Sequence, residues 1–332
     1  MVAKKADIAV IGSGSWASGI VKLLSENCSR IAWYIREPEI LEHLALHNHN
    51  PRYLSSVDFN PDLLYLTNNI NEAAEAAETI IFVIPSAFLK SSLADMTTDI
   101  SRKTVCTAIK GIVPENNTIV GEFLHKQYAV PYNNLVVLSG PTHAEEIAME
   151  KLSYLTVAAL KQEKALSVSK LLSTHYLNTV LSNDIFGTEY AAVLKNIYAI
   201  AMGIAHGLGY GDNFQAVLLS NSAREIKRFI KKVYKKKRNI TSSAYLGDLL
   251  VTAYSQFSRN RMLGNMLGKG ASVESALLNM TMVAEGYYAS ACINIINRDL
   301  GARIPIADAV YEILYSGLSP SKGIKNITSI LK

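Results

Sequence analysis

The chain has 332 residues, of which 49% are hydrophobic and 18% are charged, and its formal net charge is +5. This length exceeds what one hydrophobic core usually organises, so we expect two domains. Apolar runs stay well short of the roughly 20 residues that span a bilayer, which argues against membrane insertion. The first residues lead directly into a strand-like segment with no signal-peptide core, and we therefore expect a cytoplasmic protein.

Cysteine and histidine usage argues against a disulfide framework and against a metal site. The cysteines are odd in number and widely spaced, which favours buried or idle thiols; they are Cys28, Cys106 and Cys292. Three histidines lie close together without an accompanying cysteine or paired carboxylates; they are His43, His47 and His49. We expect them to lie in a polar, solvated segment and to bind no metal.

Positive charge is concentrated in one run, Lys227 to Arg238, which holds eight Lys or Arg residues and no acid. Removing these eight charges from the formal +5 leaves −3 on the rest of the chain. Apolar residues at helical spacing, Ile226, Phe229, Ile230 and Val233, predict a helix with one buried face and one basic, solvated face. The alternative is that this face binds nucleic acid or an anionic surface. Aromatic residues are not interleaved for base stacking, so we expect no nucleic-acid partner.

Short β-rich runs alternate with helical ones through about residue 184, which is typical of a parallel sheet covered by helices on both faces. The runs are mostly continuous and apolar, as buried strands are. The predicted strands are Asp7 to Ile11, Arg30 to Ile35, Thr79 to Ile84, Lys103 to Ile109, Asn134 to Leu138, Tyr154 to Leu160 and Asn178 to Ser182. After Asp184 the pattern becomes helical. We therefore predict an α/β domain over residues 1–184 and an all-helical domain over residues 185–332, joined by a helix around Ile185 to His206, with the active site in the cleft between them.

A GxGxxA sequence, Gly12 to Ala17, follows the first predicted strand and opens a helix. Gly12 permits a tight turn, Gly14 lets the backbone approach a pyrophosphate, and Ala17 keeps the helix close to the sheet. The free N–H groups at the start of the helix then bind the phosphates. This context indicates a dinucleotide site, with a purely structural turn as the alternative.

The end of the second strand, Tyr34-Ile35-Arg36-Glu37, bears on the choice of dinucleotide. Arg36 lies where a 2′-phosphate needs a cation, whereas Glu37 is an acid that can turn toward a ribose hydroxyl. We expect dual specificity with a preference for NADP.

Two further turns follow predicted strands and point to the carboxyl edge of the sheet, where ligands of open α/β sheets bind. Lys110 follows one strand, and Ser139 to Thr142 follows another and opens a helix. These turns offer an ammonium group, backbone N–H groups and a hydroxyl to an anionic ligand, although either alone could be a solvent-facing turn.

Polar side chains also interrupt the predicted helices of the second domain. Lys195 and Asn196 lie in the apolar stretch Tyr190 to Met202, where a lysine is costly unless it serves a cleft or extends to the surface. Burial and a nearby cation such as Lys110 would lower its pKa and suit it to proton transfer.

Two clusters further along the chain complete the candidate set. Asp248 and Thr252 are four residues apart on one predicted helix face. The run Ser258 to Arg261 concentrates hydrogen-bond donors suited to a phosphate, with an exposed surface cluster as the alternative.

Seven motifs together resemble those of the NAD(P)-dependent glycerol-3-phosphate dehydrogenases, in the order of that family and over nearly the whole chain. The motifs are Gly12 to Ala17, Lys110-Gly111, Ser139 to Thr142, Lys195-Asn196, Gly247 to Leu249, Ser258 to Asn260 and Glu285-Gly286. The resemblance implies a Rossmann-like domain followed by an all-helical substrate domain. It also implies reversible hydride transfer between NAD(P)H and dihydroxyacetone phosphate, which gives sn-glycerol 3-phosphate for glycerophospholipid synthesis, and a homodimer is compatible with it.

The same resemblance assigns roles to individual residues. It implies nucleotide contacts from Gly12, Gly14, Ser15, Trp16, Arg36, Lys110, Ala144, Arg259, Val283 and Glu285. It implies substrate contacts from Lys110, Gly140, Thr142, Lys195, Asn196, Asp248, Thr252, Ser258, Arg259 and Asn260. Lys195 would be the acid and base, Lys110 would stabilise the oxyanion, and Asp248 would orient Lys195. Arg259 and Asn260 would fix the phosphate.

The chain departs from the family's usual pattern at Ala17-Ser18 and at Ser242 to Leu246, and both departures concern loop geometry. Two other functions remain open at this point. One is a two-domain reductase of a small carboxylate, of the 3-hydroxyacid dehydrogenase or ketopantoate reductase type. The other is a non-catalytic dinucleotide-binding module, which the pair Lys110 and Lys195 argues against.

Overall fold

The computed structural model describes residues 5–280 and 282–331. The chain forms two compact units. The first comprises Met1–Ile109 and Val120–Ile185, and the second comprises Lys110–Ile119 and Phe186–Lys332. Within the described residues, no helix is long and apolar enough to cross a membrane. The three cysteines are free and buried, as expected from their spacing.

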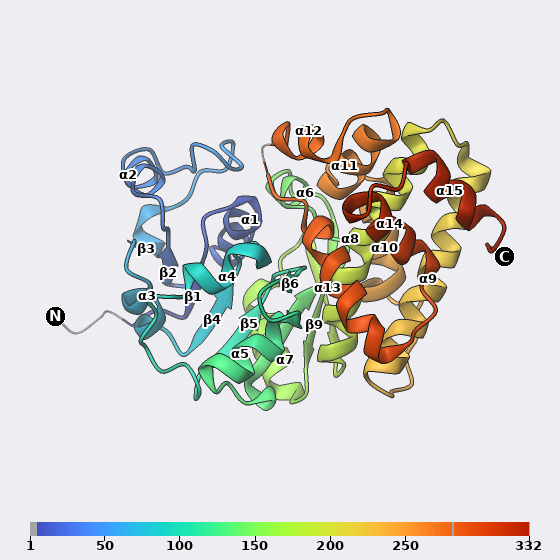
Figure 1. The fold of residues 1–332 in the computed structure, drawn as a ribbon. Coiled ribbons are helices and arrows are strands. Elements are labelled where there is room, and N and C mark those ends of the chain that lie inside the picture. Colours follow the sequence, from blue (N-terminus) through green and yellow to red (C-terminus); the bar gives the residue numbers. More distant parts are fainter. Residues whose placement is uncertain (1–4, 281, 332) are drawn as a thin grey trace. The chain divides into compact units, whose positions relative to one another are not determined.

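The first unit is built on an eight-stranded sheet (Figure 1). Its strands are β1 (Ile8–Ile11), β2 (Ile31–Tyr34), β3 (Leu64–Thr67), β4 (Thr79–Phe82), β5 (Thr104–Thr107), β8 (Leu135–Ser139), β9 (Ser153–Ala159) and β10 (Leu177–Ser182). Their order across the sheet is β10-β9-β8-β5-β4-β1-β2-β3. All seven strands expected from the sequence are present, and β3 at the edge was not expected.

Strand direction divides the sheet. From β3 to β8 every neighbouring pair is parallel, so the carboxyl ends of these strands lie at one edge. β9 runs antiparallel to β8, with Leu138 opposite Val157, and β10 runs parallel to β9. The sheet is therefore mostly parallel, and its last two strands are reversed.

Short helices connect the strands of the first unit. They are α1 (Ser15–Leu24), α2 (Pro38–His47), α3 (Ile70–Ala76), α4 (Ser86–Ser92), α5 (Val120–Tyr128), α6 (Ala144–Ala148) and α7 (Gln162–Leu172), with the 3-10 turns Pro61–Leu63 and Tyr132–Asn134. α1 packs against both α6 and α7. Its apolar residues Ile20, Leu23 and Leu24 are fully buried, as the spacing predicted, because they face the sheet.

The second unit is helical apart from one short hairpin. Its helices are α8 (Ile185–Gly207), α9 (Asp212–Val233), α10 (Asp248–Tyr254), α11 (Arg259–Gly268), α12 (Val273–Leu278), α13 (Glu285–Leu300), α14 (Pro305–Tyr315) and α15 (Pro320–Thr328). The hairpin pairs β6 (Ile112–Val113) with β7 (Thr118–Ile119), and its residues Ile112 and Ile119 join the core of this unit.

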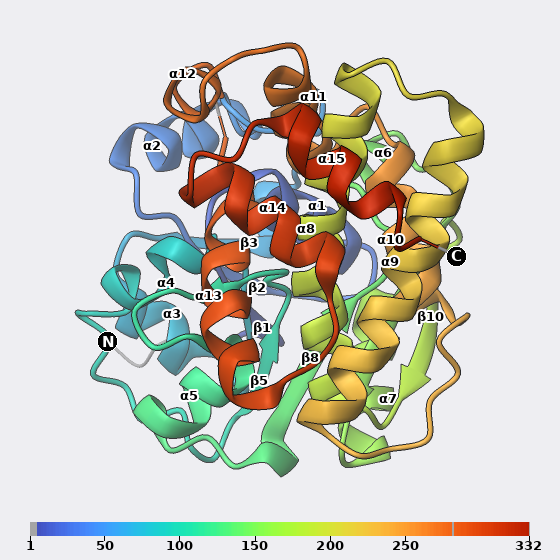
Figure 2. The same cartoon turned by 45° about the vertical axis from the view of Figure 1, so that its right-hand side comes forward.

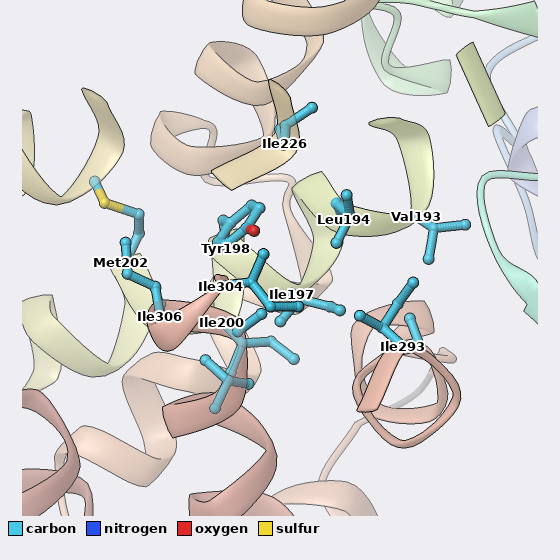
Figure 3. Close-up of a cluster of buried hydrophobic side chains, with 14 of the residues drawn as sticks. Val193, Leu194, Ile197, Tyr198, Ile200, Met202, Ile226, Ile293, Ile304 and Ile306 are labelled. Atoms are coloured by element: carbon cyan, nitrogen blue, oxygen red, sulfur yellow. The ribbon is translucent and has the colours of Figure 1, made fainter. Parts of the chain in front are cut away.

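α8 forms the centre of the helical unit. Every residue from 191 to 205 is buried, which matches the apolar stretch that the sequence shows there. Figure 3 shows its side chains among Ile226 of α9, Ile293 of α13 and Ile304 and Ile306 at the start of α14. Figure 2 shows α14 in front of α8.

Glycines allow α8 and α11 to approach closely. A Cβ placed on Gly203 of α8 would lie 2.1 Å from the carbonyl oxygen of Arg261, and one on Gly264 of α11 would lie 2.1 Å from that of Ile200. Real Cβ atoms do not approach backbone so closely, so any side chain at either position would force the helices apart.

The basic run differs from the predicted helix in its second half. α9 ends at Val233, and residues 235–238 continue without helical structure. The predicted buried face is confirmed for Ile226, Phe229 and Ile230, while Val233 is partly exposed. Four consecutive cations after Tyr234 leave no apolar residue that could keep another turn of helix attached to the core.

Candidate functional site

The turn between β1 and α1 requires glycine at its first position. Gly12 has φ +137°, which L side chains rarely adopt, and a Cβ there would lie 2.3 Å from the carbonyl oxygen of Val83. Gly12 therefore allows the chain to turn sharply against the strand that neighbours β1.

The next positions leave an open approach to the start of α1. A Cβ built on Gly14 would meet no atom within 4 Å, so the space in front of this residue is free. Gly14 is also the N-cap residue of α1 and has no side chain with which to cap the first N–H groups of the helix. Ser15 is buried, and the indole Nε1 of Trp16 has no hydrogen-bond partner within the described structure. These features fit an anionic ligand bound at a helix N-terminus.

Hydrogen bonds from outside the turn hold it in place. The indole Nε1 of Trp33 donates to the carbonyl oxygen of Gly12 at 2.7 Å. The amide of Asn50, which is fully buried, donates to the carbonyl oxygen of Ser13 at 2.9 Å and to the hydroxyl of Ser18 at 3.2 Å. Trp33 and Asn50 were not expected from the sequence, because their contacts are with backbone that only the fold brings near.

Arg36 and Glu37 follow β2 as expected, but they face different surroundings. The side chain of Arg36 is 59% exposed, and its Nη2 donates to Oε1 of Glu37 at 3.1 Å. The other carboxylate oxygen of Glu37 accepts a hydrogen bond from the hydroxyl of Ser13 at 2.6 Å. Glu37 therefore faces the glycine turn, and Arg36 lies largely in solvent.

A second turn lies at the end of β8, at the carboxyl edge that β8 shares with β5. Gly140 has φ +129°, and a Cβ there would lie 3.0 Å from the carbonyl oxygen of Tyr154. The hydroxyl of Thr142 donates to the carbonyl oxygen of Gly140 at 3.1 Å. Ala144 is buried at the start of α6, which packs against α1.

The second unit brings two lysines and one aspartate together. Lys195 of α8 donates a hydrogen bond from Nζ to Oδ1 of Asp248, at the start of α10. Nζ of Lys110, which precedes the short hairpin, lies 3.6 Å from Oδ2 of the same carboxylate. Asp248 is 1% exposed, and the side chain of Lys195 is 7% exposed. Two cations thus share one buried carboxylate.

The charge balance of this group suits Lys195 to proton exchange. Burial lowers its pKa, and although Asp248 opposes this effect, the Lys110 cation reinforces it, so that the pKa falls to about 7. At neutral pH both the ammonium and the amine form are then well populated.

Neighbouring residues hold the lysine group in position. The amide of Asn196 donates to the carbonyl oxygen of Lys110 at 2.6 Å, which ties the hairpin to α8. The hydroxyl of Thr252 donates to the carbonyl oxygen of Asp248 at 2.7 Å, one turn along α10. A single π-helical turn, Ser243–Gly247, precedes Asp248 in the segment where the sequence departs from the family pattern.

The start of α11 lies beside the start of α13. Ser258 is the N-cap residue of α11 and accepts a hydrogen bond from the backbone N–H of Arg261 at 3.3 Å. Asn260 is buried, and its side-chain oxygen accepts from the backbone N–H of Gly286 at 2.9 Å. A Cβ on Gly286 would lie 2.6 Å from the carbonyl oxygen of Asn196, so α13 begins directly on α8.

The predicted site residues divide between the two units. The first unit holds the turn residues Gly12, Gly14, Ser15, Trp16, Arg36, Gly140, Thr142 and Ala144. The second unit holds Lys110, Lys195, Asn196, Asp248, Thr252, Ser258, Arg259, Asn260, Val283 and Glu285. No group of three or more histidine, cysteine or acidic side chains in the described ranges is arranged to hold a metal ion.

Comparison with protein families gives one result for both units. The family model for the N-terminus of NAD-dependent glycerol-3-phosphate dehydrogenase matches residues 7–165. The model for the C-terminus of the same enzyme matches residues 184–325.

Individual relatives agree with this result. The NAD(P)+ glycerol-3-phosphate dehydrogenase of Exiguobacterium sp. is 34% identical over 97% of this chain and 95% of the relative. That of Bacillus cytotoxicus is 34% identical over 93% of this chain and 91% of the relative. A crystal structure of glycerol-3-phosphate dehydrogenase from Coxiella burnetii superimposes with a TM-score of 0.90 at 25% identity, covering 98% of this chain and 99% of that one.

Proposed function

The chain belongs to the NAD-dependent glycerol-3-phosphate dehydrogenase family, and from this membership we propose that it transfers hydride reversibly between NAD(P)H and dihydroxyacetone phosphate, giving sn-glycerol 3-phosphate. It is an oxidoreductase. The observation that carries the proposed mechanism is the buried group of Lys195, Asp248 and Lys110, in which a lysine with a pKa of about 7 is held beside a second cation.

The first unit fits a nicotinamide dinucleotide. Gly12 and Gly14 provide a turn whose open side adjoins the uncapped start of α1, where a pyrophosphate would be bound by backbone N–H groups. Ser15, Trp16 and Ala144 lie on or against this helix and would contact the nucleotide. When bound, the nicotinamide supplies or accepts the hydride at carbon 2 of the substrate.

Lys195 acts as the general acid and base in this mechanism. During reduction, the emerging alkoxide at carbon 2 takes a proton from the Lys195 ammonium group, and during oxidation the Lys195 amine takes the hydroxyl proton back. Asp248 orients Lys195 through their hydrogen bond, and Lys110 stabilises negative charge on the substrate oxygen. Asn196 fixes the backbone of Lys110 and so positions this second cation.

Recognition of the substrate phosphate is assigned to the start of α11. Ser258, Arg259 and Asn260 place hydroxyl, guanidinium and amide groups on consecutive residues, and Arg259 would also reach the cofactor, beside Val283 and Glu285. Gly140 and Thr142 at the end of β8, and Thr252 on α10, would line the remaining substrate surface. We extend the proposal to a cytoplasmic enzyme that forms a homodimer and supplies glycerophospholipid synthesis.

One assay tests this function. NAD(P)H absorbance is followed with dihydroxyacetone phosphate, with unphosphorylated dihydroxyacetone, and with a 3-oxo acid and a ketopantoate-type substrate in parallel. We expect turnover with the phosphorylated ketone to exceed the other rates by at least about a hundredfold in kcat/KM. Preference for a carboxylate substrate would indicate that the protein is a two-domain reductase of another specificity. No turnover with any substrate would indicate a non-catalytic dinucleotide-binding module.

A further inference from the structure

The strongest unassigned feature is the carboxylate of Glu37. Glu37 follows β2 and is the N-cap residue of α2, but its side chain makes no capping hydrogen bond there. It turns instead toward the glycine turn, where Oε2 accepts a hydrogen bond from the Ser13 hydroxyl at 2.6 Å. Ser13 lies between Gly12 and Gly14, so the carboxylate stands beside the turn that would hold the cofactor pyrophosphate.

The Ser13 end of this contact is held by other parts of the fold. The buried amide of Asn50 fixes the backbone carbonyl of Ser13, and Trp33 fixes that of Gly12. The Glu37 side chain is 25% exposed, so it is partly shielded and still open to a ligand. The carboxylate is therefore placed before any ligand arrives.

Arg36 does not supply a free cation at this position. Its guanidinium group donates to Oε1 of Glu37, and its side chain is more than half exposed. An exposed pair of this kind contributes little binding energy, but the carboxylate offsets the field that Arg36 would present to an anion. Of the two side chains, the acid faces the turn and the cation faces solvent.

Glu37 remains ionised under ordinary conditions. Burial alone would raise the pKa of its carboxyl group, but hydrogen bonds from Ser13 and from its own backbone N–H, together with the Arg36 cation, outweigh burial and lower the pKa. A negative charge is therefore present at this position throughout the neutral pH range.

We propose that Glu37 reads the adenosine ribose of the cofactor and that the enzyme selects NAD(H) over NADP(H). In dinucleotide folds an acid after the second strand accepts hydrogen bonds from the ribose 2′-hydroxyl, whereas a 2′-phosphate at that position needs a cation. A phosphate placed beside Glu37 would meet a like charge and would break the hydrogen bond from Ser13. This inference rests on the proposed function, which brings the dinucleotide to this turn, and it reverses the preference for NADP expected from Arg36.

Direct binding separates this inference from the activity. The affinities of NADH and NADPH are measured by calorimetry on the full chain, together with those of adenosine monophosphate and its 2′-phosphorylated form. These two fragments differ only at the group that Glu37 would read. We expect the unphosphorylated member of each pair to bind at least tenfold more tightly.

Three variants assign the selectivity to its residue. Glu37→Gln should reduce the ratio of the two affinities at least tenfold, and Ser13→Ala should reduce it less, because the carboxylate keeps its charge but loses its anchor. Arg36→Gln is the matched control beside it and should change the ratio less than about threefold. Glu37→Asp should restore part of the selectivity that Glu37→Gln removes.

The outcomes distinguish the role of Glu37 from the dehydrogenase function. Equal or tighter binding of the phosphorylated nucleotides by the wild type overturns the role of Glu37 while leaving the dehydrogenase function intact. That role is equally contradicted if Arg36→Gln abolishes NADPH binding or if Glu37→Gln leaves the ratio unchanged. If neither nucleotide binds and no substrate turns over, the proposed function itself fails. Should Glu37→Gln not fold, the wild-type fragments and Arg36→Gln still decide the question.

Discussion

Among single residues, the buried ammonium group of Lys195 gives the clearest prediction. Its pKa of about 7 means that the acid form predominates below pH 7 and the base form above it. We therefore expect kcat/KM for ketone reduction to fall as pH rises through about 7, and that for alcohol oxidation to rise through the same range. Rates measured in both directions from pH 5.5 to 9 would show these opposite profiles.

Substitutions assign the profile to this residue. Lys195→Ala should lower kcat at least about a hundredfold and leave nucleotide binding nearly intact, because the nucleotide contacts are proposed to lie elsewhere. Asp248→Asn should move the midpoint of the profile to lower pH, since the carboxylate raises the pKa of Lys195. Near-normal kcat in folded Lys195→Ala would remove the lysine from its role.

Arg259 carries the prediction for substrate choice. Arg259→Leu should impair use of dihydroxyacetone phosphate far more than the residual use of dihydroxyacetone, because only the former has a dianion that loses its partner. A charge-assisted bidentate contact in a water-poor site contributes about 2 to 4 kcal/mol, or roughly thirty- to a thousandfold in kcat/KM. Part of the loss should appear in kcat, since a loosely held phosphate no longer positions carbon 2. Equal effects on both substrates would contradict a phosphate contact.

Among the helices, the close crossing of α8 and α11 predicts an unusual response to alanine. In a helix interior, alanine is favoured over glycine by roughly 1 kcal/mol. At Gly264, however, a Cβ would lie 2.1 Å from backbone, and overpacking costs about 1 to 3 kcal/mol or more. We expect Gly264→Ala to lower the melting temperature. Gly19→Ala in α1 is the matched control, because its Cβ would make an ordinary 3.4 Å contact and should not destabilise the protein.

Glu225 joins three helices and makes stability depend on pH. From α9 it accepts hydrogen bonds from the backbone N–H groups of Ile306 at 2.9 Å and Ala307 at 3.3 Å in α14, and from the hydroxyl of Tyr198 in α8 at 3.2 Å. Burial raises its pKa to about 7 in spite of these contacts. Its contribution to stability is therefore fully present below the unfolded pKa near 4.5 and is lost as pH rises through about 7.

Thermal unfolding tests this dependence. Between pH 5.5 and 8 the free energy of unfolding of the wild type should fall by on the order of 2 kcal/mol relative to that of Glu225→Gln, because the amide of the variant does not titrate. Burial raises the pKa of Asp308 to about 6, so the stability of the variant keeps a smaller dependence on pH. If the stability of the two proteins changes equally with pH across this range, the assignment to Glu225 is contradicted.

The elements also show which features a sequence reveals. Long apolar runs identified seven strands and the central helix α8, because a buried strand or helix needs continuous apolar residues. β3 was missed because it is only partly buried at the edge of the sheet, and β6 and β7 were missed because they have two residues each. The reversal of β9 leaves no mark on the pattern, since a buried strand is equally apolar in either direction.

In the site, too, some features are visible in the sequence and others depend on the fold. Glycine turns and a lysine in an apolar helix are visible in sequence, because each breaks a local rule. The direction of Glu37 and the contacts of Asn50 depend on long-range hydrogen bonds, which no local pattern records. Local sequence patterns therefore nominate candidate residues for the site, but they do not predict how the side chains are oriented.

The chain as a whole passes between its two units three times, at 109/110, 119/120 and 185/186. A fragment covering residues 186–332 lacks Ile112 and Ile119, which are 0% and 1% exposed in the core of the second unit. We expect this fragment to melt at a lower temperature than one in which residues 110–119 are restored through a short Gly-Ser linker. Each buried isoleucine stabilises by about 1.5 to 3 kcal/mol. Identical melting of the two fragments would show that the hairpin is dispensable for this core.

The three passages of the chain between its units affect how the gene can be recombined. A single breakpoint at 185/186 keeps Lys110 with the coding sequence of the first unit, while Asp248 and Asn196, which contact it, come from the other parent. A chimera of two relatives made in this way would combine the hairpin of one parent with the helical unit of the other, although the two did not evolve in the same protein. Two additional breakpoints, on either side of residues 110–119, would be needed to exchange the second unit whole. The proposed proton-transfer group of Lys110, Lys195 and Asp248 is thus encoded in two separate pieces of the gene, even though its side chains form one cluster in the folded protein.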